Sequence, residues 1–184
     1  DDTEIVIKAT ITLNSASATK TFTIKFLKKV ENATSSIYNF EGRNDYTGSP
    51  LDNDGLKALL EKYERQANAN ILSITETSNI FDGHTGYGGH SDELQKQALK
   101  IGSNGGPSKT VIKFAKKIKQ VKIKARSYSS YNNANLSINN KQAEIYTDEF
   151  QEYTIKLRTA TDTITFETLK KQIISIMSIE FVYE

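Results

Sequence analysis

The chain contains only two histidines, His84 and His90, and they flank a glycine-rich segment. With Asp92 they offer two imidazoles and one carboxylate, a donor set that suits zinc or nickel. The glycines predict a loop, so neither a helix nor a strand fixes the spacing that a metal site needs. We therefore assign no metal ligand and take His84 and His90 as candidate ligand-binding residues. A metal-binding loop and an ordinary surface loop stay open as alternatives.

A second candidate group combines tyrosines with amides. Tyr128 and Tyr131 bracket two serines and lead directly into Asn132 and Asn133. A tyrosine ring can cover the apolar face of a sugar while neighbouring amides bond its hydroxyls. With Tyr87 from the glycine-rich segment, these residues are the predicted ligand-binding set. The alternative is that the tyrosines are packing residues of the core or of a corner.

Three aspartates gather before the first helical pattern, at Asp45, Asp52 and Asp54. Hard oxygen ligands suit calcium, but the spacing of an EF-hand loop is absent. Capping of the helix by Asp54 is the simpler interpretation. We predict no cofactor, and a structural calcium ion stays open.

A basic run extends from Lys113 to Arg126. Lys122, Lys124 and Arg126 alternate with apolar residues, which predicts one basic sheet face. Such a face suits an anionic polymer such as DNA, teichoic acid or an acidic glycan. A solvated face with lysines that protect a sheet edge is the alternative.

Composition and motifs together disfavour an enzyme. The 184 residues include no cysteine and have a net charge of only +2, with 37% hydrophobic and 25% charged residues. These values are typical of a globular domain. Nucleotide-binding P-loops, serine-hydrolase elbows and zinc-protease motifs are all missing. We therefore name no catalytic residue. About 18 consecutive apolar residues would be needed for a membrane span, and the sequence has no such run.

The elements that must position these residues are mainly strands. Alternating patterns predict a hairpin over residues 3–28, and the leucine spacing from Leu56 to Tyr63 predicts the one convincing helix. Residues 31–50 are predicted to form a linker. Later strands are predicted at Ile71–Thr75, Ala98–Gly102, Thr110–Phe114, Gln120–Ser127, Asn135–Ile138, Ala143–Tyr146, Gln151–Leu157, Thr163–Glu167 and Ile173–Tyr183, with turns at Asn139–Asn140 and Thr159–Asp162.

From Phe81 onward the sequence resembles a known module. The matching segments are Gly86–Gly88, Ala98–Ser103, Gly105–Gly106, Val111–Phe114, Ile118–Ala125, Ala134–Asn139 and Ile176–Phe181. They are similar to the C-terminal galactose-binding-like jelly roll of secreted proteins from low-GC Gram-positive bacteria and mollicutes. The hairpin resembles the last two strands of a bacterial immunoglobulin-like repeat. The resemblance implies a carbohydrate-binding fold and a secreted or cell-surface location.

The predicted architecture is mainly β: a hairpin at 1–30, a linker and helix at 31–70, and a jelly-roll β-sandwich at 71–184. The first function hypothesis is a non-catalytic binding module of a secreted or cell-surface bacterial protein, with a glycan as partner. The second is an accessory domain that tethers a secreted nuclease or hydrolase to DNA or teichoic acid through the basic face. The third is a structural or adhesion spacer without a small ligand.

Overall fold

The computed structural model describes residues 3–13, 16–26, 33–65, 70–84, 92–129 and 132–184. Strands dominate these residues, as the sequence predicts, and two helices accompany them. The elements are β1 (Thr3–Leu13), β2 (Ala16–Phe26), β3 (Ser35–Asn39), α1 (Asn53–Lys62), β4 (Ile71–Ser78), β5 (Ile80–Phe81), α2 (Glu93–Gln97), β6 (Leu99–Ile101), β7 (Ser108–Ser127), β8 (Ala134–Ile138), β9 (Lys141–Ile145), β10 (Gln151–Thr168) and β11 (Ile174–Tyr183).

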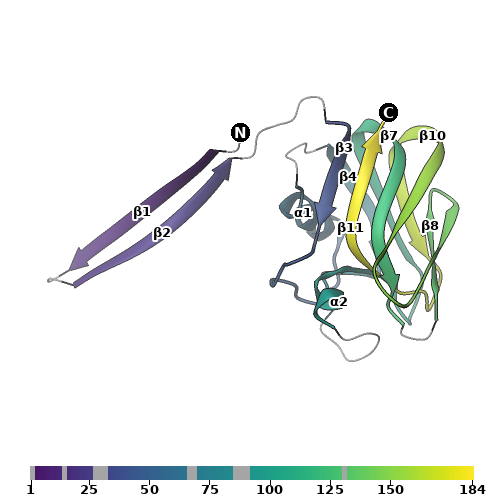
Figure 1. Cartoon of the computed structure of the whole chain (residues 1–184), viewed down its shortest axis with the longest axis horizontal. Helices are drawn as coiled ribbons and strands as arrows, with labels where there is room; N and C mark the ends of the chain where they lie inside the picture. The colour runs from purple at the N-terminus through teal and green to yellow at the C-terminus, as the bar shows by residue number, and fades with distance from the viewer. Residues whose placement is uncertain (1–2, 14–15, 27–32, 66–69, 85–91, 130–131) are drawn as a thin grey trace.

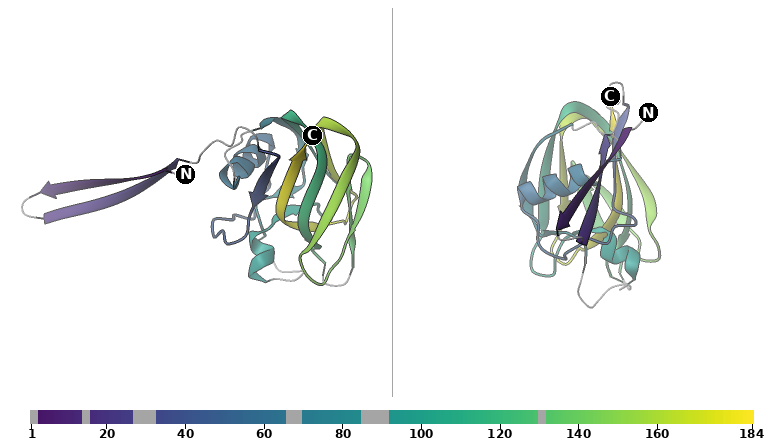
Figure 2. Two further views of the ribbon diagram at one scale, coloured as in Figure 1. Left: turned by 45° about the horizontal axis from the view of Figure 1, so that its top comes forward. Right: turned by 90° about the vertical axis from the view of Figure 1, so that its left-hand side faces the viewer.

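Strands β1 and β2 form the N-terminal hairpin that the alternating pattern predicts. They pair antiparallel along their whole length, from Thr3 opposite Phe26 to Leu13 opposite Ala16. They form a sheet of their own, which shares no pairing with the larger sheet. Figures 1 and 2 show the hairpin extending away from the rest of the molecule. Membership in an immunoglobulin-like repeat stays a prediction.

The other nine strands form one antiparallel sheet that folds over into two layers. Its order is β5–β6–β11–β7–β10–β8–β9, with β3 also pairing with β11 and β4 with β7. The layer that we call the β11 layer holds β3, β5, β6, β11 and one half each of β7 and β10. The β8 layer holds β4, β8, β9 and the other halves (Figure 1).

Strands β7 and β10 connect the layers because each is long enough to run through both. Ser108–Lys113 of β7 pairs with Thr163–Thr168 of β10 in the β8 layer, and Gln120–Ala125 pairs with Gln151–Lys156 in the β11 layer. Between these stretches the register shifts twice. Such irregularities bend strands. From the sequence, each of these strands was predicted as two separate strands, with a turn at Thr159–Asp162. This prediction is wrong, because the chain bends there without leaving the strand.

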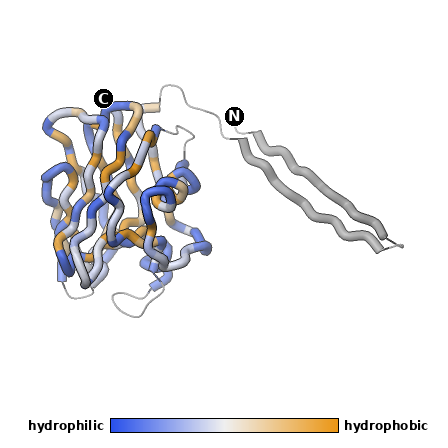
Figure 3. The backbone as a smooth tube through the Cα atoms, turned by 180° about the vertical axis from the view of Figure 1, so that it is seen from behind, coloured by the Kyte–Doolittle hydropathy of each residue, from blue (hydrophilic) through white to orange (hydrophobic). Residues whose placement is uncertain are grey.

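The core lies between the two layers. Phe181 of β11 is fully buried and its ring lies 4.6 Å from that of Phe114 and 6.2 Å from that of Phe166, both on the opposite layer. Hydrophobic residues accordingly alternate with polar ones along the sandwich strands (Figure 3). The alternation that predicts most of these strands is the same pattern that fills this core.

Helix α1 packs on the sandwich with the leucines that its spacing predicts. Leu56, Leu59 and Leu60 are buried in the common core, and Tyr63 is partly buried against it. The capping residue differs from the prediction. Asp52, rather than Asp54, is the N-cap, since its carboxylate accepts a hydrogen bond of 2.8 Å from the amide of Gly55. Asp54 lies in the first turn, where its charge still favours the helix dipole.

The linker predicted at 31–50 and the single predicted helix both need correction. Ser35–Asn39 form β3, which pairs with β11 and buries Tyr38 in the core. Phe40 just after β3 is fully buried as well. A second, short helix, α2, is capped by Asp92 before Glu93–Gln97. Both elements are rich in polar residues, so the sequence showed no clear hydrophobic pattern there. Within the described residues, no helix is both long and apolar enough to cross a membrane.

Candidate functional site

Three loops meet at the end of the sandwich opposite the bends of β7 and β10. They are the connections β6–β7, β7–β8 and β10–β11, and backbone hydrogen bonds join them. The amide of Lys171 donates to the carbonyl of Ser103 over 3.1 Å, and the amide of Tyr128 donates to the carbonyl of Ile173 over 2.9 Å. The loops therefore form one fixed rim, as the sandwich topology predicts.

A single glycine allows this rim to close. Gly102 adopts a φ of 101°, a conformation that side chains strongly disfavour. A Cβ atom at this position would lie only 2.0 Å from the carbonyl oxygen of Gln172. The β10–β11 loop can approach β6 only because residue 102 has no side chain.

The rim borders an open cavity of about 620 Å³. Its lining is mostly uncharged and polar, with one aromatic ring and one cationic residue among the described residues. The lining residues are Asn104, Ser127, Tyr128, Ser129, Asn132, Asn133, Ala134, Lys171, Gln172 and Ile173. The arrangement offers several amide and hydroxyl groups beside a tyrosine, which is the chemistry that recognises a polyol.

Tyr128 is fixed by contacts behind the cavity. Its hydroxyl shares a 2.7 Å hydrogen bond with Nε2 of His84, and the two rings meet edge to face at 4.7 Å. The Lys100 ammonium lies 5.4 Å from the centre of the Tyr128 ring. Burial raises the pKa of Tyr128 and lowers the pKa of Lys100. The tyrosine is therefore a neutral, oriented side chain.

His84 is itself held in place by the residues around it. It is buried, and its backbone amide donates a hydrogen bond of 3.1 Å to the carbonyl of Lys96 in the last turn of α2. Gly83 next to it has a φ of 79° and lies against the same carbonyl. Asp82 forms a buried ion pair of 2.5 Å with Arg43. His84 therefore positions Tyr128, and it does not line the cavity.

The two asparagines differ in how much of their hydrogen-bonding capacity is used. The Asn133 amide nitrogen donates to the carboxylate of Glu144 over 3.0 Å. Asn132 uses its backbone, since its carbonyl accepts a 2.7 Å hydrogen bond from the Ser127 hydroxyl. Its exposed side-chain amide bonds no other residue that the structure describes, and it is available to a ligand.

The predicted ligand-binding residues are only partly placed. His84 and Tyr128 are in contact although 44 positions separate them, and Asn132 and Asn133 line the same cavity as Tyr128. Tyr87, His90 and Tyr131 lie outside the described residues. Sequence reasoning missed Asn104 and Gln172. The Ser-Asn-Gly-Gly-Pro turn around Asn104 was the available signal, since it predicts a loop at a sheet end.

The residues of the predicted basic face, Lys122, Lys124 and Arg126, alternate with apolar residues along β7 as expected. Each of the three, however, is paired with a carboxylate. Lys122 lies 2.9 Å from Glu180, and Lys124 lies 3.8 Å from Glu41. Arg126 is buried, contrary to its predicted exposure. Its guanidinium lies 2.6 Å from the carboxylate of Asp92 and donates to Gln95 over 3.0 Å. Helix α2 brings these partners over the strand, which the pattern of one strand cannot show.

Two of the three aspartates considered for calcium have other partners. Asp45 accepts hydrogen bonds from Lys62 and Tyr63, which lower its pKa to about 2. Asp52 caps α1. Across the described ranges, no three histidine, aspartate or glutamate residues gather as a metal site would need.

The likeness of this chain to known proteins is distant. No family model matches it, and no curated protein sequence does. The catalytic unit of a thermostable GH87 alpha-1,3-glucanase from Streptomyces thermodiastaticus aligns with 60% of this chain and 24% of its own, at 9% identity and a TM-score of 0.37. A family two carbohydrate esterase from Cellvibrio japonicus aligns with 60% of this chain and 31% of its own, at 11% identity and a TM-score of 0.34. The chain thus spans less than a third of either protein, and the alignments carry no inference about function.

Proposed function

We propose that this protein is a non-catalytic glycan-binding module. The observation that supports the proposal is the cavity of about 620 Å³ at the loop end, with Tyr128 beside four amide side chains. Amides both donate and accept hydrogen bonds, as the hydroxyls of a sugar do. The tyrosine ring supplies an apolar surface for the C–H groups.

The lining favours binding over chemistry on the ligand. Hydrolysis of a glycosidic bond uses two carboxyl groups on opposite sides of the bond. The described lining of the loop-end cavity contains neither an aspartate nor a glutamate. The nearby His84 is turned to Tyr128, and the nearby Glu144 is bonded to Asn133.

A tether to an anionic polymer has less support. Its three candidate contacts, Lys122, Lys124 and Arg126, each lie beside a carboxylate, so the local positive charge is largely cancelled. A polymer would have to displace those partners. The setting that goes with the glycan proposal is a secreted or cell-surface protein, as the sequence resemblance implies.

The experiment is a glycan array probed with the protein displayed on a tetrameric carrier, because multivalency raises weak binding to a detectable level. We expect selective binding to uncharged glycans. Asn132→Ala removes an exposed amide and should weaken binding at least about fivefold without lowering the melting temperature. Asn44→Ala, another exposed asparagine in a loop, is the matched control and should bind like the wild type.

Two outcomes contradict the proposal. A silent array together with salt-sensitive retention on DNA or teichoic acid would support the polymer tether. Silence on the array and on both polymers would support the spacer.

A further inference from the structure

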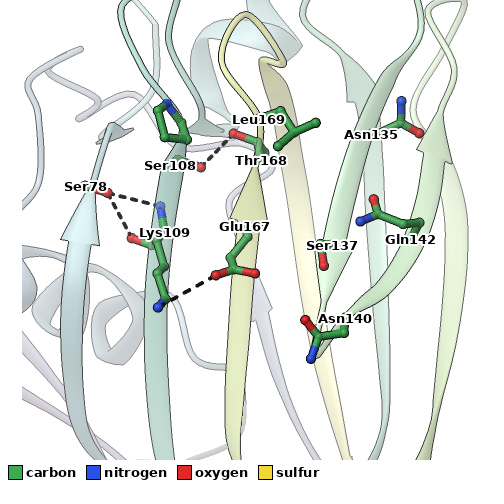
Figure 4. A pocket seen from close by; sticks show the side chains of 11 residues that line it. Ser78, Ser108, Lys109, Asn135, Ser137, Asn140, Gln142, Glu167, Thr168 and Leu169 are labelled. Atoms are coloured by element: carbon green, nitrogen blue, oxygen red, sulfur yellow. Dashed lines mark hydrogen bonds and ion pairs between the residues drawn. The ribbon is translucent and has the colours of Figure 1, made fainter.

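The outer face of the β8 layer contains a second hollow, away from the loop-end cavity. Its volume is about 370 Å³, and it adjoins another hollow of about 370 Å³ with which it shares Lys109, Asn140 and Glu167. Figure 4 shows its side chains over neighbouring strands of this layer. The described lining residues are Ser78, Pro107, Ser108, Lys109, Asn135, Ser137, Asn140, Gln142, Glu167, Thr168 and Leu169.

Strand register arranges part of this lining in a straight row. Lys109 of β7 lies opposite Ser78 of β4 on one side and opposite Glu167 of β10 on the other. Ser137 of β8 lies opposite Glu167, and Gln142 of β9 lies opposite Ser137. Adjacent strands are about 4.8 Å apart, so the row crosses five strands over roughly 20 Å. An extended polymer of several units would match this length.

Several neutral side chains of this hollow have no hydrogen-bond partner among the described residues. The side chains of Asn135, Ser137, Asn140 and Gln142 form no hydrogen bond with any residue that the structure describes. Ser137 is only 8% exposed, so its hydroxyl lies at the floor rather than on an outer rim. Burying polar groups without partners costs free energy. Asn135, Asn140 and Gln142 are exposed around this floor. Together the four side chains offer polar contacts to a ligand that lies in the hollow.

Lys109 and Glu167 are the two charged residues of the described lining, and their opposite charges balance. The Lys109 ammonium lies 2.6 Å from Glu76 and 3.8 Å from Glu167. At one end, Leu169 is 73% exposed and offers an apolar contact. A protein interface would be expected to centre on aromatic or larger apolar residues, and the described lining has only Leu169 and Pro107. The chemistry therefore selects an uncharged ligand with many hydroxyls.

We propose that this row is a second binding surface, which takes an extended uncharged polysaccharide across the five strands of the β8 layer. The proposal rests on glycan binding as the function, but it concerns residues separate from the loop-end cavity. The loop end receives a short glycan segment or chain end, and the row contacts several consecutive sugar units of a long chain.

Native gels that contain dextran, laminarin, galactomannan or xylan test this proposal. We expect retardation of the wild-type protein in at least one gel. The double variant Ser137→Ala/Gln142→Ala should bind the retarding polysaccharide about tenfold more weakly, since it loses two hydrogen-bonding groups of the row. Gln151→Ala replaces a half-buried glutamine of β10 in the β11 layer, and this control should behave like the wild type. Thermal melting confirms that all variants are folded.

A short oligosaccharide from the same polymer separates the two surfaces. The row variant should bind a disaccharide as the wild type does, whereas Asn132→Ala should lose this binding. Unchanged polysaccharide retardation in the folded row variant, with loss in Asn132→Ala, overturns the second surface and leaves the proposed function intact. Retardation only in polygalacturonate overturns the uncharged ligand class. Retardation of the wild type in no gel and silence on the glycan array overturn both proposals together.

Asn140 supplies an independent test of the same row. Its φ of 64° belongs to the left-handed region, so alanine would strain the β8–β9 turn. Asn140→Gly removes the amide and keeps this backbone conformation accessible. We expect weaker polysaccharide retardation with the melting temperature nearly unchanged. Retardation equal to the wild type would remove Asn140 from the binding surface and, with an unaffected double variant, overturn the proposal.

Discussion

The two outer faces of the sandwich both carry polar side chains, but they use them differently. On the β11 layer, Lys122 and Arg126 are paired with carboxylates, and Arg126 is buried beneath helix α2. On the β8 layer, Ser137, Asn140 and Gln142 bond no described residue and surround a hollow. The polar groups named on the β11 layer, which we call the closed face, are therefore used within the protein. Those on the β8 layer, which we call the open face, remain available to a ligand.

This difference cautions against judging a surface by its charge alone. The basic run is the most conspicuous surface feature of the sequence, yet Lys122, Lys124 and Arg126 are each paired with a carboxylate. Exposed ion pairs add little stability, and they also lower the attraction for a charged polymer. The neutral side chains of Ser137, Asn140 and Gln142 form no pattern that predicts a binding surface. They are nevertheless the groups that remain available.

The largest expected effect concerns the loop that borders both cavities. Gly102→Ala places a Cβ atom against the carbonyl of Gln172 and forces a φ of 101° on an alanine. Backbone strain and overpacking together should cost about 2–6 kcal/mol in the free energy of unfolding. Gly105→Ala is the control, since its Cβ would meet only ordinary contact at 3.7 Å. Urea unfolding measures both, and equal stability of the two variants would contradict the closure described above.

The second expected effect separates a core leucine from one on the open face. Leu60 is 1% exposed and Leu169 is 73% exposed. Leu60→Ala should destabilise the protein by about 2–5 kcal/mol, because it leaves a cavity. Leu169→Ala should change stability by less than about 0.5 kcal/mol. A large loss for Leu169→Ala in thermal unfolding would mean that it serves packing rather than the open face.

The third prediction compares two cations of the closed face. Arg126→Met leaves the buried Gln95 without its partner and should cost about 1.5–3 kcal/mol. Lys122→Met breaks a half-exposed pair and should cost less than about 1 kcal/mol. Chemical denaturation of both variants gives the two values. Similar losses would show that Arg126 is not an integral part of the β11 layer.

Removal of residues 1–32 should have a smaller effect. The hairpin shares no strand pairing with the sandwich, so both faces belong to the remaining chain. We expect cooperative unfolding within a few degrees of the full chain's melting temperature, which corresponds to less than about 1 kcal/mol. Calorimetry measures this difference. Aggregation of the shortened chain would assign the hairpin to the core and move the predicted boundary at residue 30.

The smallest effect is a pH dependence outside both faces. Hydrogen bonds from Lys62 and Tyr63 lower the pKa of Asp45 to about 2, from an ordinary value of 3.8. The stabilisation is therefore complete above about pH 4 and is lost as the pH falls toward 2. Asp45→Asn should be less stable than the wild type at pH 7, and the gap should close over that range. A constant gap in unfolding experiments down to pH 2 would contradict this assignment.

Local sequence patterns determined the strands and the main helix. Period-two alternation located most strands, because one side of each strand faces the core at Val121, Ile123 and their counterparts. The leucines of α1 were predicted for the same reason. Alternation could not show that β7 and β10 continue through their bends, since a bend interrupts the pattern as a turn does. Nor could it show β3, because its two apolar residues, Ile37 and Tyr38, are adjacent and polar residues stand on either side of them.

The candidate sites depend more strongly on tertiary structure. The sequence by itself placed Tyr128, Asn132 and Asn133 in one loop, because adjacent residues stay adjacent in any fold. Only the tertiary structure brought His84 to Tyr128, Gln172 to the same cavity and Asp92 to Arg126. The row from Ser78 to Gln142 likewise exists only through strand register, which joins residues 64 positions apart. Local preferences act over a few residues, whereas the order and register of strands are set by the packing of the whole chain.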